Sequence, residues 1–140
     1  MVNKKTNILF ICKYNLFRSK VAETYLRKIN PSLKISSAGV VPYNINLPKG
    51  KQERNKILLE KFNIKIKGNP NGVSAKLLEK QDKIIVISDD IPKEVFNNKL
   101  WKDKVNVWKI ENEEGSNKQK IEKIVKAIIL RVDKLNKELK

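Results

Sequence analysis

The sequence predicts an α/β fold, a small three-layer sandwich in which about four parallel strands are flanked by helices. Short runs rich in β-branched residues alternate with longer segments of helical periodicity, which is typical of βαβ units. The first run, NILFIC at residues 7–12, is almost wholly apolar, as in a strand buried on both faces of a sheet. No repeat or linker divides the 140 residues, so we expect a single domain over residues 1–140.

The first half of the chain contains two predicted strands and two predicted helices. After the first strand, apolar residues at positions 21, 22, 25 and 26 line one side of a helix that Asn30-Pro31 ends. A β-branched stretch then stops at Ala38-Gly39, and the next segment holds two prolines and several asparagines. Ile57, Leu58 and Phe62 give the second helix its inward side. The predicted elements are a strand at 7–12, a helix from about 19 to 29, a strand at 33–37, a loop at 40–50 and a helix at 51–62.

The second half continues the same alternation. A polar stretch, KGNPNG, separates it from the first half, and Asp89-Asp90 ends the strand KIIVIS. The last helix has an apolar stripe with the spacing of a core-facing helix, and Ser116 with Gln119 predicts a capping box at its start. That stripe is Ile121, Ile124, Val125, Ile128 and Val132. The predicted elements are a short helix near 74–79, a strand at 83–88, a short helix from about 92, a strand at 105–110 and a helix from about 117 to near the C-terminus.

This topology predicts where a ligand binds. In open parallel sheets, ligands lie beyond the C-terminal ends of the strands. We therefore expect Cys12, Gly39, Asp89 and the segment after Ile110 to gather at one edge of the sheet.

The composition restricts the chemistry that this edge can perform. The chain has one cysteine and no histidine. It therefore has no internal disulfide, no zinc site of the Cys/His kind and no catalytic pair that uses imidazole. No metal or organic cofactor is implied. The lone cysteine fits a reducing compartment, and no apolar run approaches the roughly 20 residues of a membrane span, so we expect a cytoplasmic protein that does not bind membranes.

The net charge of +16 suggests anionic partners, among them nucleic acid. The lysines, however, are scattered along the chain instead of forming one stripe. A nucleic-acid surface also needs exposed aromatic residues, whereas Trp101 and Trp108 are predicted to pack beside the fourth strand. Nucleic acid is therefore not the favoured partner, although a basic surface attracts phosphorylated substrates. Only four basic residues are arginines: Arg18, Arg27, Arg54 and Arg131.

The loop between the first strand and the first helix carries the chemistry. Five residues separate a cysteine from an arginine, which is enough for a loop whose backbone N–H groups converge on an anion. The helix that follows directs its positive N-terminal end to the same place, and Arg18 can hold two phosphate oxygens. The predicted phosphate-binding residues follow Cys12 in the order Lys13, Tyr14, Asn15, Leu16, Phe17, Arg18 and Ser19.

The same electrostatic field favours a thiolate at Cys12, and the Ser19 hydroxyl can stabilise it by donating a hydrogen bond. Such a thiolate can attack phosphorus in line and form a phosphocysteine, which water then hydrolyses. A cysteine at the end of an apolar strand is also commonly just a small buried residue of the core. Its location at the ligand edge of the sheet favours the catalytic interpretation.

The stretch ILFICKYNLFRSKVAE resembles the signature of the low-molecular-weight protein tyrosine phosphatases, Cys-x-x-Asn-x-x-Arg-Ser followed by Ala-Glu in a helix. Ser37-Ala38-Gly39 and IIVISDD resemble later segments of the family in the same order. The resemblance implies that Cys12 is the nucleophile, that Arg18 binds phosphate and that Ser19 supports the thiolate. It also implies that Asn15 braces the loop by holding a strained backbone conformation.

The chain departs from the family pattern at several positions. Tyr14 replaces a glycine, Phe17 replaces a small residue or cysteine, and Lys20 replaces a proline. Asn112 stands where the family has the aspartate that protonates the leaving oxygen, and an amide has no such proton to give. Either Glu111 or Glu113 substitutes for it, or turnover is slow, or the protein only binds phosphorylated ligands.

Three functions other than phosphatase activity are considered for this loop. Arsenate reduction coupled to thioredoxin needs further cysteines, and a phosphotransfer carrier with a cysteine loop generally lacks the arginine. A catalytically weak phospho-ligand-binding module is the main alternative, supported by Asn112. For an active phosphatase, the substrate is a phosphorylated protein or a small phosphomonoester: phosphotyrosine, phosphoarginine and metabolites are all open, as is the oligomeric state.

Overall fold

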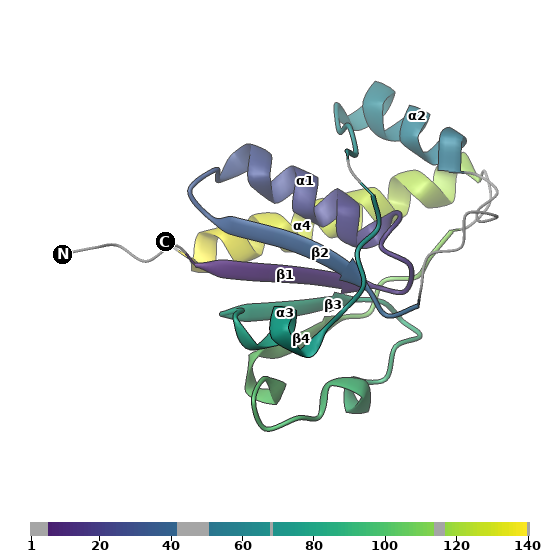
Figure 1. Ribbon diagram of the computed structural model, residues 1–140. Helices are drawn as coiled ribbons and strands as arrows, with labels where there is room; N and C mark the ends of the chain where they lie inside the picture. Colours follow the sequence, from purple (N-terminus) through teal and green to yellow (C-terminus); the bar gives the residue numbers. More distant parts are fainter. Residues whose placement is uncertain (1–5, 42–50, 68, 114–116, 140) are drawn as a thin grey trace.

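The fold is a four-stranded, all-parallel sheet covered by helices (Figure 1). It is seen in a computed structural model that describes residues 6–41, 51–67, 69–113 and 117–139. The strands are ordered β2-β1-β3-β4, so the chain crosses over between β2 and β3. The elements are β1 (Asn7–Cys12), α1 (Arg18–Ile29), β2 (Lys34–Gly39), α2 (Lys51–Phe62), α3 (Ala75–Glu79), β3 (Lys83–Ile87), the 3₁₀ helices η1 (Lys93–Phe96) and η2 (Lys102–Lys104), β4 (Val105–Trp108) and α4 (Lys118–Glu138).

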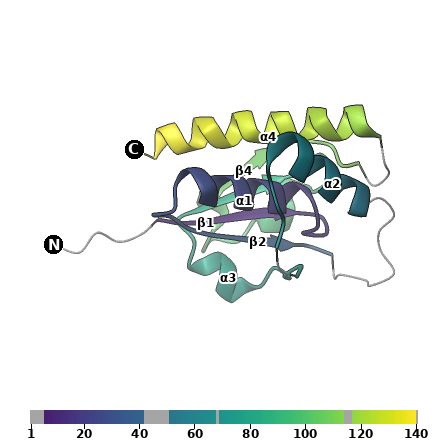
Figure 2. The ribbon, with the colours of Figure 1, turned by 90° about the horizontal axis from the view of Figure 1, so that it is seen from above.

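Two hydrophobic cores, one on each face of the sheet, make the fold a three-layer sandwich. Alternate residues of β1 point to opposite faces, so Ile8 and Phe10 belong to one core and Leu9 and Ile11 to the other. The larger core is covered by α1, α2 and α4, and the smaller one by α3 and by the segment that includes η1. Figure 2 shows α3 on the face opposite the three longer helices. The predicted fold class is confirmed.

Several boundaries differ from those predicted. β2 continues two residues past Ser37, because Ala38 and Gly39 pair with Ile11 and Cys12 of β1. β4 ends at Trp108, and η2 was not predicted. The capping box predicted at Ser116 is wrong, because the Asn117 side chain caps α4 by accepting from the Lys120 N–H. Ser116 itself and most of the predicted loop, residues 42–50, lie outside the described residues.

The strand register determines which residues meet at the C-terminal edge of the sheet. Cys12 at the end of β1 pairs with Gly39 at the end of β2, and β3 and β4 end together, with Ile87 opposite Trp108. The Ser88 N–H then donates to the Trp108 carbonyl at 3.0 Å. The loops after β1, β3 and β4 therefore start side by side, as the sequence predicts.

No helix among the described residues is long and apolar enough to span a membrane.

Helix α4 packs along α1, and the apolar stripe of α4 is fully buried. A polar contact supports the same helix pair: the Tyr25 hydroxyl donates to an Asp133 carboxylate oxygen at 2.6 Å. Burial and this hydrogen bond raise the pKa of Tyr25 to about 12.

This contact predicts a pH-dependent contribution to stability. Because the folded-state pKa is raised, the contribution is complete below the ordinary tyrosine value of 10.0 and is lost as the pH rises through about 12. Tyr25→Phe should cost about 1 kcal/mol of unfolding free energy at neutral pH. It should also remove the tyrosinate absorbance step near pH 12. Persistence of that step in Tyr25→Phe would contradict the assignment.

Candidate active site

The sulfur of Cys12 lies at the end of a short chain of buried polar groups. Cys12 Sγ is 2.9 Å from Ser19 Oγ, and Asn15 Nδ2 donates to the same hydroxyl oxygen at 2.7 Å. A hydroxyl has one hydrogen, and the Asn15 amide occupies an acceptor position on Ser19. The Ser19 hydrogen is therefore available to the sulfur, in the arrangement that stabilises a thiolate.

Asn15 holds the middle of the loop in an unusual backbone conformation. Its φ is +57°, in the left-handed region that asparagine tolerates better than most residues, and its side chain is completely buried. The Asn15 carboxamide oxygen accepts from the Asn71 N–H at 2.8 Å. Both ends of this carboxamide are thus hydrogen bonded, which fixes the turn between Cys12 and Arg18.

The end of β2 packs against the back of the loop. The N–H groups of Val40 and Val41 donate to the carbonyls of Cys12 and Lys13 at 3.2 and 2.9 Å. A Cβ on Gly39 would lie 2.7 Å from the carbonyl carbon of Tyr14, closer than non-bonded atoms approach. Position 39 therefore requires glycine, because any side chain there would collide with the backbone of the loop.

The loop amides form a potential anion site. Within the described part of the chain, no protein atom accepts a hydrogen bond from the N–H groups of residues 13–17. Helix α1 starts directly after them at Arg18, and no side chain caps it. Free N–H groups at a helix N-terminus bind anions. Lys13 and Tyr14 lie at the partly exposed rim, whereas the residues from Asn15 to Ser19 are buried.

The Arg18 side chain is buried, and one nitrogen of its guanidinium group has polar partners. Only 1% of it is exposed. Its NH1 donates to the Ile110 carbonyl at 2.8 Å and lies 3.8 Å from an Asp89 oxygen. Its Nε is buried and has no hydrogen-bond partner among the described residues. A buried donor without a partner is costly, and an oxyanion at this edge would satisfy it.

The acidic turn after β3 balances the positive charges of the loop. Lys13 Nζ lies 3.5 Å from an Asp90 oxygen. The pKa of Asp90 is lowered, first by a hydrogen bond from the Ser88 hydroxyl and then by the charges of Arg18 and Lys13. Asp90 is therefore a carboxylate at neutral pH, and it orients the loop cations instead of donating a proton.

The segment after β4 lies against the phosphate loop through Arg18. Glu111 and Glu113 lie 3.6 and 4.0 Å from the Lys120 ammonium group, so both acids share one cation. The Glu113 side chain is 16% exposed and that of Glu111 is 45% exposed. Asn112 lies between them and is half-buried. Both acids that the sequence singled out thus lie on the segment after β4, and Glu113 is the more enclosed of the two.

One buried residue at this site was missed by the sequence reasoning. Arg54 of α2 is 4% exposed, its NH1 donates to the Glu113 carbonyl at 3.0 Å, and its guanidinium lies 5.3 Å from the centre of the Phe17 ring. The available signal was the choice of arginine in a chain whose other basic residues are nearly all lysines.

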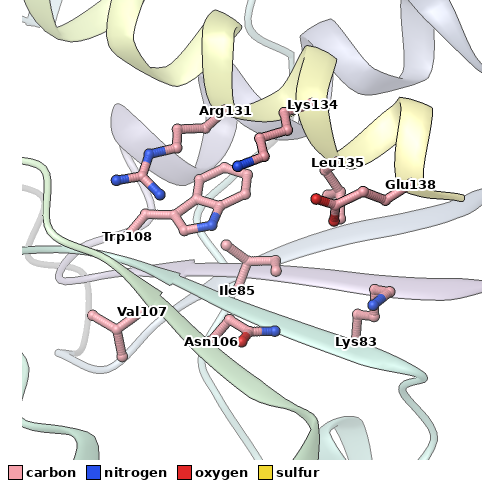
Figure 3. A pocket seen from close by; sticks show the side chains of 9 residues that line it. All are labelled: Lys83, Ile85, Asn106, Val107, Trp108, Arg131, Lys134, Leu135 and Glu138. Atoms are coloured by element: carbon pink, nitrogen blue, oxygen red, sulfur yellow. The ribbon is translucent and has the colours of Figure 1, made fainter.

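Two cavities lie near the C-terminal ends of the strands, and only the first of them is lined by a residue of the loop. One, of about 320 Å³, is lined by Tyr14, Gly39 and Asn71, and the other, of about 460 Å³, by Asp89, Asp90 and their neighbours. A third cavity of about 260 Å³ lies between β4 and the C-terminal half of α4, with Trp108 and Arg131 in its wall (Figure 3). No loop residue lines that third cavity. The described residues contain no group of three Cys, His, Asp or Glu side chains that could hold a metal ion.

The fold and this loop define an α/β protein with a cysteine and an arginine at one anion site. A family model, that of the low molecular weight phosphotyrosine protein phosphatases, matches residues 7–140. The chain therefore belongs to this family and is a cysteine-dependent phosphatase that acts on phosphorylated substrates. The family suspected from the sequence is confirmed.

Solved structures show the same fold. The tyrosine phosphatase Wzb from Escherichia coli is 19% identical with a TM-score of 0.83, covering 98% of this chain and 100% of its own. A low molecular weight protein tyrosine phosphatase from T. tengcongensis is also 19% identical, with a TM-score of 0.80 and coverages of 96% and 99%. An arsenate reductase from Archaeoglobus fulgidus is 26% identical, with a TM-score of 0.68 and coverages of 91% and 97%. No curated protein sequence matches the chain significantly.

The contact between Gly39 and the loop predicts a specific loss of anion binding. Gly39→Ala should displace the backbone of Tyr14 and Asn15, cost about 1–3 kcal/mol of stability and weaken binding of inorganic phosphate. Gly72 is the matched control, because it forms an isolated β-bridge with Gly39 and a Cβ there would meet nothing within 4 Å. Calorimetric phosphate titration of both variants is the measurement. Equal phosphate affinity in Gly39→Ala and Gly72→Ala would show that Gly39 does not shape the site.

Proposed function

We propose that this phosphatase cleaves phosphomonoesters through a phosphocysteine formed on Cys12. The observation that carries the proposal is the arrangement around the sulfur. Ser19 Oγ lies 2.9 Å away, and Nε of the buried Arg18 guanidinium has no hydrogen-bond partner among the described residues. In the same part of the chain, no acceptor is found for the N–H groups of residues 13–17 in this loop. These features supply what an imidazole supplies in other cysteine enzymes.

In the first step, the loop N–H groups and Arg18 bind the three non-bridging phosphate oxygens. The Cys12 thiolate attacks phosphorus, a sulfur–phosphorus bond forms, and the bond from phosphorus to the leaving oxygen breaks. The electron pair of that bond goes to the leaving oxygen, which must take up a proton unless it is a stable anion. NH1 of Arg18 is held by the Ile110 carbonyl, so the guanidinium needs no reorientation to bind the anion.

The proton donor is assigned to Glu113. Asn112 has no acidic proton, and Asp90 is held in its charged form. Of the two remaining acids on the segment after β4, Glu113 is the more enclosed and its backbone carbonyl is held by Arg54. In the second step the resulting carboxylate accepts a proton from the water that attacks phosphorus, and the thiolate leaves with the electron pair of the sulfur–phosphorus bond.

A phosphorylated protein, with phosphotyrosine as the reacting group, is the proposed substrate. Its support is the family description and the cavity of about 320 Å³ that Tyr14 lines, which offers room for the rest of a substrate. We also place the reaction in the cytoplasm, where a single cysteine stays reduced. The related arsenate reductase suggests a second activity, but with one cysteine the chain has no resolving thiol for a disulfide relay.

Replacement of the nucleophile gives the first test of this mechanism. The wild-type protein should hydrolyse p-nitrophenyl phosphate, and Cys12→Ser should abolish turnover because a serine hydroxyl is not ionised in this field. Cys12→Ser should still bind inorganic phosphate, since the loop amides and Arg18 remain. Turnover by Cys12→Ser at the wild-type rate would remove the cysteine from the mechanism.

Restoring the family's acid tests the assignment of the proton donor. Because Glu113 already supplies the proton in this proposal, Asn112→Asp should leave kcat/KM for phenyl phosphate, whose leaving group needs a proton, nearly unchanged. Glu113→Gln should lower kcat/KM for phenyl phosphate and change that for dinitrophenyl phosphate little, with Glu111→Gln as its matched control. If Glu111→Gln reduces the rate and Glu113→Gln does not, the assignment to Glu113 is wrong.

A further inference from the structure

The segment that follows β4 is held at two carbonyls by two different arginines. Arg18 NH1 donates to the carbonyl of residue 110 at 2.8 Å, and Arg54 NH1 donates to that of residue 113 at 3.0 Å. Asn112 and the side chain of Glu111 lie between these two points. A backbone fixed at both ends presents its side chains in one orientation, which proton transfer to a leaving group requires.

Arg54 is also attached to the phosphate loop. Its guanidinium lies 5.3 Å from the centre of the Phe17 ring, within cation–π range. Phe17 is 3% exposed and immediately precedes Arg18 and helix α1. One buried guanidinium from α2 therefore contacts both the loop that binds phosphate and the segment that carries the acids.

The burial of Arg54 indicates that its contacts with the loop and with the segment after β4 do more than fill space. A guanidinium carries a charge and several N–H donors, so holding one at 4% exposure requires compensating hydrogen bonds. The apolar residues of α2 that face the core, Ile57 and Leu58, already attach the helix to the larger core. An ordinary apolar residue at position 54 could pack on Phe17, but only a donor can hold the Glu113 carbonyl.

We propose that Arg54 is a positioning residue for proton transfer: it fixes the 110–113 segment relative to the phosphate loop, so that the acid on this segment meets the leaving oxygen. The ring of Phe17 packs against the guanidinium and aligns it. This inference rests on the proposed function, because it concerns the first chemical step of the same site.

The test compares substrates that differ in their need for a proton. Arg54→Met removes the donor and keeps an unbranched side chain, Arg54→Lys keeps the charge but not the planar fork, and Phe17→Leu removes the ring face. Arg131→Met is the matched control, an exposed arginine in the wall of the third cavity. For each variant, kcat/KM is measured with phenyl phosphate and with dinitrophenyl phosphate, together with the inhibition constant of inorganic phosphate and the Tm.

Arg54→Met should lower kcat/KM for phenyl phosphate by about 10-fold or more and for dinitrophenyl phosphate by less than about 3-fold, because general acid catalysis typically contributes 10²–10⁴-fold. Phosphate inhibition should be unchanged. Arg54→Lys and Phe17→Leu should show the same selectivity to a smaller degree, and they carry the test if Arg54→Met does not fold. Equal losses with both substrates would overturn the proposal, as would no loss with either.

A second readout separates this inference from the proposed function. Amide hydrogen exchange of residues 110–113 should accelerate in Arg54→Met and remain unchanged in Arg131→Met, whether or not the enzyme turns over. If wild type and Cys12→Ser have equal activity, the proposed function fails, and exchange alone decides whether Arg54 holds the segment. Unchanged exchange in Arg54→Met would overturn the inference while leaving an active Cys12 untouched.

Discussion

The hydrogen bond between Ser19 and the Cys12 sulfur is the contact on which the rest of the site depends. A chain without histidine must stabilise a thiolate by other means, and here a hydroxyl 2.9 Å from the sulfur is held by the Asn15 amide. Asn15 adopts its left-handed conformation because both ends of its carboxamide are hydrogen bonded. These hydrogen bonds hold the loop from within the protein.

Charge balance explains the surroundings of the loop. A buried arginine and a helix N-terminus form a positive site, and without a bound anion such a site is electrostatically unfavourable. The carboxylates of Asp89 and Asp90 partly neutralise it. NH1 of Arg18 donates to the Ile110 carbonyl, whereas its buried Nε has no hydrogen-bond partner among the described residues.

The parts of this site that lie close together in sequence could be predicted, and those that depend on distant contacts could not. The apolar strand at 7–12 and the spacing from Cys12 to Arg18 predict the loop, because its geometry is local. The parallel topology also predicts that Gly39 and Asp89 approach it. By contrast, the packing of Arg54 on Phe17 joins residues from separate elements, and no periodicity encodes it. The cap of α4 is Asn117, one residue after the predicted cap, and the sequence alone could not locate it because serine and asparagine are both good capping residues.

The alkylation rate of the single cysteine tests the central claim most directly. The account predicts that iodoacetamide modifies Cys12 in the folded protein at neutral pH faster than in the urea-unfolded chain, and that inorganic phosphate protects it in a saturable manner. Replacement of Ser19 by alanine should reduce the rate without abolishing protection. A folded-state rate no higher than that of the unfolded chain, unaffected by phosphate, would contradict a preformed anion site around a reactive sulfur.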